Sequence, residues 1–204
     1  MLSLLLLNLL NFSYSTLSYI ITKYGYFSIF VLMILEASSF PIPSEVVLPL
    51  AGLFSAKGML NIYIVLPLVF LSSFVGMAIN YYIAYLLGKD VVYRHLHWFR
   101  IKQSDVEAFE RWFERNGPFV VFISRLLPVV RGLINFPAGF ALMDQKKFYA
   151  YSMLGSVIWD TALTLFGFYA LSASNGYIVL VTIGLFGLTI YAIYKFAVAH
   201  IRKS

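Results

Sequence analysis

The sequence predicts an all-α integral membrane protein. Of its 204 residues, 61% are hydrophobic and only 12% are charged, whereas soluble domains use about 45 to 50% apolar residues. Long apolar runs recur along the chain, and charge is most concentrated between residues 89 and 116. We therefore expect one membrane domain over residues 1–204, with about four transmembrane helices, two oppositely oriented re-entrant helical hairpins and amphipathic interfacial helices.

The first half of the chain contains a short apolar segment, an interrupted segment and a long span. Residues 1–22 lack the basic start and the small-residue cleavage site of a signal peptide, so we expect an interfacial helix there. Residues 25–88 form the first repeat. It opens with a span that is interrupted at Glu36, continues with a re-entrant hairpin at about residues 40–55, and ends with a span over residues 62–87.

The central segment, residues 89–116, is predicted to be a cytoplasmic amphipathic helix that lies on the inner membrane surface. Ser104 is a suitable N-cap for this helix. Apolar residues follow it at helical spacing among charged ones, namely Val106, Phe109, Trp112 and Phe113.

The second half repeats the plan of the first. Residues 117–171 form the second repeat, with a re-entrant hairpin at about residues 119–143 followed by a span over residues 148–171. The uncharged turn after it leads to a C-terminal transmembrane helix over residues 177–199.

The distribution of lysine and arginine gives the orientation in the membrane. Both cluster at residues 89–115, at 146–147 and near the C-terminus, and both are absent from residues 37–56 and 172–176. By the positive-inside rule, the basic loops and the C-terminus are cytoplasmic, in a plasma membrane protein. The first hairpin then enters from outside and the second from inside, which makes an inverted repeat.

Prolines and glycines support this plan. The prolines are best explained as the residues that break the two hairpins, and the glycines as positions of close helix approach. The residues concerned are Pro41, Pro43, Pro49, Pro128 and Pro137, with Gly52 and Gly139, and with Gly76 and Gly155 in the long spans.

Charged residues inside the apolar segments are the candidate functional residues. A charge in hydrocarbon costs several kcal/mol, so Glu36, Glu45, Arg125 and Arg131 must face one another, water or a charged ligand. Planar guanidinium groups suit phosphate oxygens, although a structural bridge from the arginines to the glutamates is also compatible. The glutamates can carry protons or act as permanent counterions, and Asp160 can extend a proton relay or pack helices.

Several motifs carry a resemblance to a known family. They are residues 41–45 (PIPSE), 113–117 (FERNG), 125–131 (RLLPVVR), 137–139 (PAG) and 155–159 (GSVIW). At these motifs the sequence resembles the DedA family, also called SNARE-associated Golgi or VTT-domain proteins.

The resemblance covers about residues 23–170 and implies two re-entrant hairpins and translocation of lipids across the bilayer. Bacterial members are associated with the recycling of polyprenyl phosphate carriers and with proton-dependent envelope functions. Eukaryotic relatives resemble phospholipid scramblases.

The leading hypothesis is a flippase or scramblase for a phosphate-bearing lipid, with or without proton coupling. The alternatives are a small-ion or drug/proton antiporter and a non-transporting membrane assembly or homeostasis factor. We expect no enzyme, because the sequence has neither G-x-S-x-G nor H-E-x-x-H and no histidine in a span or hairpin. Cofactors, metals and nucleic acid are not expected, and a homo-oligomer is compatible with the sequence.

Overall fold

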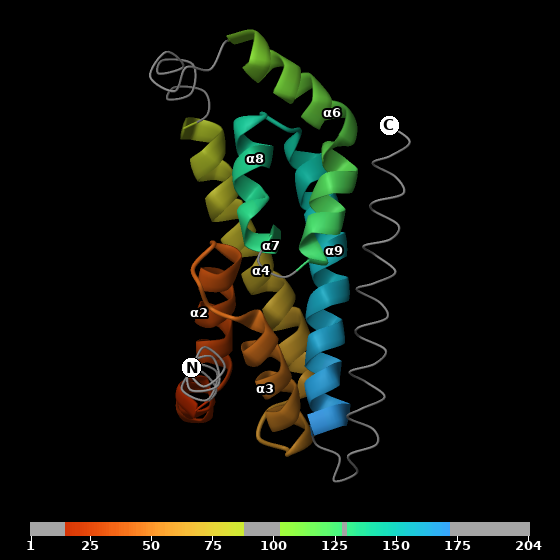
Figure 1. Ribbon diagram of the computed structural model, residues 1–204. Coiled ribbons are helices and arrows are strands. Elements are labelled where there is room, and N and C mark those ends of the chain that lie inside the picture. Colours follow the sequence, from red (N-terminus) through yellow and green to blue (C-terminus); the bar gives the residue numbers. More distant parts are fainter. Residues whose placement is uncertain (1–14, 88–102, 128–129, 172–204) are drawn as a thin grey trace, which may run out of the picture.

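The computed structural model of the chain describes residues 15–87, 103–127 and 130–171. Within these ranges the secondary structure is helical, and most helices run along one long direction of the molecule (Figure 1). Residues 15–24 are helical, which is the later part of the predicted interfacial helix. Its first 14 residues and the predicted C-terminal helix at 177–199 lie outside the described residues.

The first interrupted segment forms two short helices. Helix α2 (Tyr26–Ala37) ends one residue after Glu36, and α3 (Ser44–Ala56) follows. Between them, Ser39 adopts a positive φ of 67°. Pro41 and Pro43 lie in the non-helical stretch of residues 40–43, where their missing N–H groups keep the helix from continuing.

Pro49 does not break the first hairpin as the sequence predicts, because it lies inside α3. A proline in a helix removes one hydrogen bond to the carbonyl four residues earlier, here that of Glu45 in the first turn. One lost bond is tolerated in α3, because the helix is buried from Val47 to Ser55. Helix α3 instead ends at Ala56, and Gly58 turns the chain with φ 75°.

The long span of the first repeat agrees with prediction at both ends. Helix α4 (Ile62–Leu87) has 26 residues, about 39 Å of helix against a hydrocarbon core of about 30 Å. Among the described helices it is the one that is long and apolar enough to cross a membrane. The expected count of four spans stays a prediction.

The amphipathic helix continues beyond its predicted end. Helix α6 (Gln103–Arg125) runs through Gly117 and Pro118 instead of ending at residue 116, and it bends part-way along its length (Figure 1). The carbonyl that Pro118 leaves without its helical donor belongs to Glu114, an exposed residue. Water can therefore replace the missing bond, which explains why the helix continues.

The second interruption follows α6. Helices α7 (Val130–Leu133) and α8 (Asn135–Phe140) are separated at Ile134. This break lies one turn before Pro137, which cannot donate a hydrogen bond to the carbonyl of Leu133. Pro128 lies outside the described residues. Helix α9 (Gln145–Phe166) then begins at the N-cap Asp144 and passes into the π-helical turn η2 (Gly167–Leu171).

The two halves pack through corresponding glycines, of which the first pair lies in the long helices. Gly76 of α4 is so close to α2 that an added Cβ would lie 2.5 Å from the Ile34 carbonyl oxygen. Gly155 of α9 has the same relation to α6, where a Cβ would lie 2.9 Å from the Phe122 carbonyl oxygen. In each half, the long helix therefore packs through a glycine against the helix that precedes the interruption, α2 against α4 and α6 against α9.

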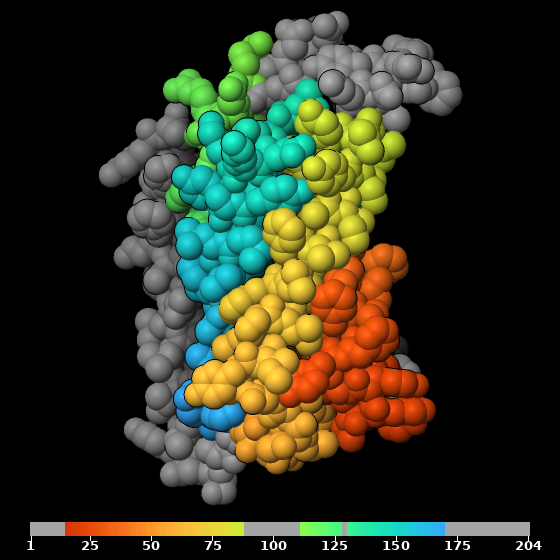
Figure 2. Space-filling model, turned by 180° about the vertical axis from the view of Figure 1, so that it is seen from behind, coloured from red at the N-terminus to blue at the C-terminus, as the bar shows by residue number. Residues whose placement is uncertain are grey.

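The second glycine pair lies in the helices that follow the breaks. Gly52 of α3 packs against the Thr164 carbonyl of α9, and Gly139 of α8 packs against α4, where a Cβ would lie 2.8 Å from the Tyr81 carbonyl oxygen. The contacts are therefore exchanged between the halves, which supports the predicted repeat. From behind, α4 lies between α2 and α9 (Figure 2).

Two apolar cores lie at different levels of the molecule, and each contains residues of both halves. One cluster joins residues 17–54 to the early part of α4 and the late part of α9, including Val65, Val69 and Leu163. The other joins α6 and α8 to the later part of α4, including Met77 and Tyr81. Between these levels α4 presents the buried hydroxyls of Ser72 and Ser73. A polar layer therefore separates the two cores.

Candidate functional site

Arg131 is the centre of the polar layer. Its Nε lies 3.1 Å from Glu36 Oε1, and its Nη2 lies 3.0 Å from Asp160 Oδ1. The three residues come from α7, α2 and α9 and are 3%, 7% and 0% exposed. Charged hydrogen bonds from a planar guanidinium to two carboxylates are among the strongest that a protein makes. The network therefore ties both interrupted segments to a long helix.

Neighbouring side chains complete this network. The Ser73 hydroxyl on α4 donates to Asp160 Oδ2 at 2.9 Å. The guanidinium carbon of Arg131 lies 5.9 Å from the centre of the Trp159 ring, within cation–π range. Asp160 is thus oriented by an arginine on one side and a hydroxyl on the other.

Arg125, at the end of α6, is compensated in a different way. It is 1% exposed, and its Nη2 donates to Asn135 Oδ1 and, at 3.4 Å, to the Ser152 hydroxyl. Within the described residues no carboxylate forms a salt bridge with it. Asn135 in turn donates from Nδ2 to the Ala37 carbonyl at 3.1 Å. A neutral amide therefore connects the second arginine to the end of α2.

Glu45 lies apart from the arginines. It is an exposed residue in the first turn of α3, and no salt bridge to it occurs in the part of the chain that the structure describes. The predicted opposition of two glutamates and two arginines is therefore realised as one glutamate, one aspartate and Arg131. The roles of these residues in transport stay predictions.

A pocket of about 530 Å³ opens beside Arg131. Glu36, Glu45 and Arg131 supply its charges, and Phe40 and Leu133, which are 58% and 52% exposed, are among its apolar residues. The other lining residues are Ser39, Pro41, Ile42, Pro43 and Gly132. The pocket thus combines buried charge with apolar walls, and both interrupted segments line it.

Ser39 joins the two interrupted segments beside this pocket. Its hydroxyl donates to the Gly132 carbonyl at 2.8 Å and accepts from Asn80 Nδ2 at 2.6 Å. These two bonds connect the stretch after α2 to α7 and to α4. The positive φ of Ser39 therefore lies where the chain must turn to make this connection.

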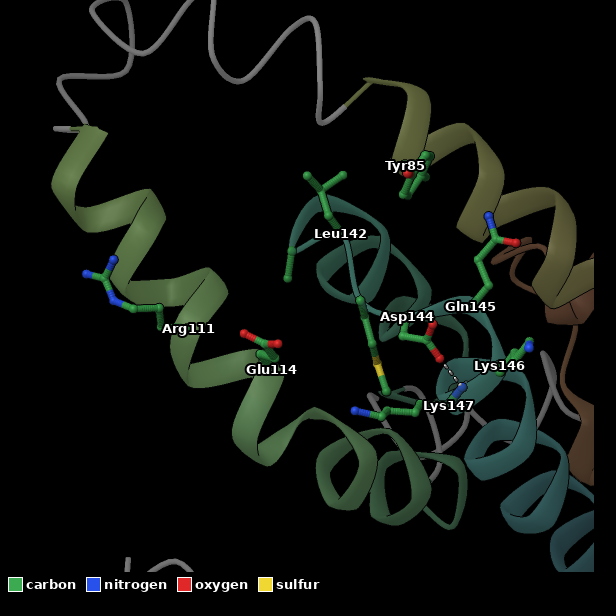
Figure 3. Close-up of a pocket in the computed structure, with 10 residues that line it drawn as sticks. Tyr85, Arg111, Glu114, Leu142, Asp144, Gln145, Lys146 and Lys147 are labelled. Carbon is green, nitrogen blue, oxygen red and sulfur yellow. Dashed lines mark hydrogen bonds between the residues drawn. The ribbon is translucent and has the colours of Figure 1, made fainter.

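A wider cavity of about 700 Å³ lies between α6 and the connection from α8 to α9. Arg111 and Glu114 stand on one side of it, and Asp144 and Lys147 stand on the other (Figure 3). Its charges are exposed and of both signs. It contains none of the candidate residues of the polar layer, so the pocket beside Arg131 is the candidate site.

Comparison with known proteins gives the family. Residues 42–169 match the VTT domain. The chain belongs to the VTT-domain family. The matched region contains both arginines, Glu45 and Asp160, whereas Glu36 lies just before it.

Three relatives illustrate the similarity of this VTT-domain protein. It is 38% identical over 151 residues to undecaprenyl phosphate transporter A of Staphylococcus aureus, with 72% of this chain and 74% of the relative covered. It is 31% identical over 153 residues to an alkaline phosphatase-like protein of Lactococcus lactis subsp. cremoris, with 72% of each chain covered. It is 26% identical over 110 residues to protein DedA of Escherichia coli, with 54% and 50% covered. No solved structure matches the chain.

Sequence reasoning missed several members of this VTT-domain site. Asn135, Ser73 and Ser152 are neutral residues within apolar runs, where they form no recognisable spacing pattern. The one available signal was that buried polar groups need partners. Counting the hydrogen-bond donors of two buried arginines would have shown that more acceptors are required than the glutamates supply.

Proposed function

We propose that this protein moves a phosphate-bearing lipid, such as a polyprenyl phosphate, across the plasma membrane. The observation that carries the proposal is a buried arginine at a pocket with apolar walls. The name of the Staphylococcus aureus relative, undecaprenyl phosphate transporter A, supports a lipid phosphate as the substrate.

The pocket suits an amphiphile. A phosphate would meet Arg131, while a hydrocarbon tail would lie along the apolar side of the pocket, where Phe40 and Leu133 are exposed. In this proposal the breaks after α2 and α6 are the tips of two re-entrant hairpins that enter from opposite faces. The basic loops and the C-terminus are cytoplasmic.

The charge balance of the polar layer favours proton coupling. Glu36 and Asp160 together offset Arg125 and Arg131 when all four side chains are ionised. A phosphate would add one to two negative charges to this apolar environment, which is costly. Uptake of a proton by a carboxylate would restore the balance, so headgroup entry and protonation are linked in this proposal.

Reconstitution into liposomes tests the function. We expect purified protein to translocate a labelled polyprenyl phosphate faster than protein-free liposomes do, with a rate that depends on a pH gradient. Arg125→Ala and Arg131→Ala should abolish translocation, whereas Arg111→Ala, an exposed arginine on α6, should keep the wild-type rate. Wild-type rates in both buried-arginine variants would contradict the proposal.

Further substrates in the same assay separate the alternatives. Translocation of labelled glycerophospholipids without a pH gradient would indicate passive scrambling, and ion flux without lipid movement would indicate an antiporter. The name of the Lactococcus relative makes phosphate release a necessary control. Liberation of inorganic phosphate from the lipid by purified protein would favour an enzyme instead.

A further inference from the structure

Helix α3 begins at the edge of the pocket without a side-chain cap. Pro43 is the N-cap residue, has an extended backbone and makes no side-chain capping bond. Pro43 and Glu45 both line the pocket, with Ser44 between them in sequence. Pro41 and Pro43 fix their own backbone φ angles and have no N–H groups, so they restrict the conformation of the chain just before α3.

Donors at this helix start have no acceptor in the described part of the chain. The N–H groups of Val46 and Val47 bond to the Pro43 carbonyl at 3.0 and 3.2 Å, but those of Ser44 and Glu45 have no such partner. The Ser44 hydroxyl is buried, since the residue is 1% exposed, and it also has no partner. A helix start normally satisfies such donors with a side chain, water or a ligand.

A second unpartnered donor belongs to Arg131, which also lines the pocket. Arg131 uses Nε and Nη2 for Glu36 and Asp160, but its buried Nη1 has no partner among the described residues. Unsatisfied donors are costly in an apolar environment, and each calls for an explanation. One bound group that accepts hydrogen bonds from both sides would satisfy all of them.

We propose that the first turn of α3 is the second half of a phosphate cradle, in which the Ser44 hydroxyl and the N–H groups of Ser44 and Glu45 face Arg131 Nη1. Phosphate is the chemistry that fits, because a helix start offers backbone N–H groups and a positive dipole end to an anion. The inference rests on the proposed function. It adds a contact from the first interrupted segment to the arginine of the second.

Two carboxylates oppose an anion in this cradle. Glu36 is held by Arg131, but Glu45 lines the pocket without an ion pair in the described residues. Removing the charge of Glu45 should therefore strengthen phosphate binding, whereas removing the Ser44 hydroxyl should weaken it. Opposite effects from adjacent residues are a signature that general destabilisation does not produce.

Equilibrium binding to the purified full chain in detergent tests the cradle. The probes are a polyprenyl phosphate, the polyprenol of equal length, and inorganic phosphate. Ser44→Ala removes the hydroxyl alone. Ser44→Pro also removes the backbone N–H, and proline is accommodated at the first position of a helix after an extended residue. Ser55→Ala is the matched control, a buried serine at the other end of α3 whose hydroxyl bonds to the Ala51 carbonyl.

We expect wild-type protein to bind the polyprenyl phosphate and not the polyprenol. Ser44→Ala should weaken binding about tenfold, Ser44→Pro should weaken it further, and Glu45→Gln should strengthen it. Ser55→Ala should bind as wild type does. Thermal unfolding of each variant checks that the fold is retained.

The outcomes separate this inference from the function on which it rests. If both Ser44 variants bind within about twofold of wild type while Arg131→Ala does not bind, the cradle is wrong and the lipid function stands. If wild-type protein does not distinguish polyprenyl phosphate from polyprenol, the proposed function itself fails. If inorganic phosphate alone binds as tightly as the lipid and loses affinity in Ser44→Ala, the cradle stands with a soluble phosphate as its ligand.

Discussion

At the scale of single residues, the two buried arginines differ in what balances them. Arg131 contacts two carboxylates, whereas Arg125 contacts an amide and a hydroxyl. A buried ion pair is weak evidence for stability, because desolvation offsets much of the attraction. Breaking such a pair, however, leaves an uncompensated charge. Removing Arg131 alone, or together with its two carboxylate partners, should therefore distinguish its effect on stability from its effect on transport.

The first prediction concerns removal of one charge or of all three. Arg131→Met alone should lower the free energy of unfolding by about 3 to 5 kcal/mol, because Glu36 and Asp160 stay buried without their cation. Combining it with Glu36→Gln and Asp160→Asn should recover most of that loss. Thermal and denaturant unfolding in detergent measure both effects.

Transport should not recover in the same combined variant. A phosphate ligand needs the guanidinium, so a stable but inactive triple variant would separate function from folding. Translocation by the triple variant at the wild-type rate would show that Arg131 serves the fold alone.

The second prediction concerns the amide that holds Arg125. Asn135→Ala removes the acceptor for a fully buried guanidinium and the donor to the Ala37 carbonyl. We expect the free energy of unfolding to fall by about 3 kcal/mol. Asn116→Ala is the matched control, because Asn116 donates an exposed hydrogen bond to the Trp112 carbonyl of its own helix and has no other side-chain bond within the described residues. Equal losses in both variants would contradict the importance of the buried amide.

At the scale of helices, sequence patterns located uninterrupted segments better than broken ones. The predicted bounds of α4 agree with the structure, because a long, mostly apolar run lies between Asn61 and the Gly88–Lys89 pair. Proline was the less reliable signal. Pro49 and Pro118 both lie inside helices, since the cost of one lost backbone bond depends on surroundings that the sequence alone does not give.

The third prediction concerns close helix packing. Gly52→Ala should destabilise the protein by at least about 1 to 3 kcal/mol, because its Cβ would lie 2.7 Å from the Phe168 backbone nitrogen and still closer to the Thr164 carbonyl. Backbone cannot move aside as a flexible side chain can. Gly132→Ala should cost much less, since its Cβ would approach no atom closer than 3.4 Å. Thermal unfolding of the two variants decides between them.

At the scale of the whole molecule, the sequence indicates where the helices are interrupted but not which charged side chains pair with one another. The paired interruptions and the glycines of both halves were visible as short motifs. Which carboxylate meets which arginine was not, because Glu36, Arg131 and Asp160 lie 29 to 95 residues apart in pairs that hydrogen bond. Their proximity depends on how three helices pack, and no local pattern encodes it.

The fourth prediction tests the orientation in the membrane. The chain has no cysteine, so a single introduced thiol is a unique label. Lys57 and Lys146 are exposed and lie just after α3 and in the first turn of α9. Lys57→Cys should react with a membrane-impermeant maleimide in intact cells, whereas Lys146→Cys should react only after permeabilisation. The reverse labelling pattern would overturn the assignment of sides.

The exchanged glycine contacts have a consequence for energetics. Helix α3 of the first half packs against α9 of the second, and α8 of the second half packs against α4 of the first. Moving either α3 or α8 away therefore breaks glycine contacts of the same kind. Two conformations related by such an exchange would differ little in free energy, and little work would be stored in either. Under the proposed function, the direction of net movement would then follow the combined gradients of lipid and protons across the bilayer, and the same protein would run in reverse when those gradients are inverted.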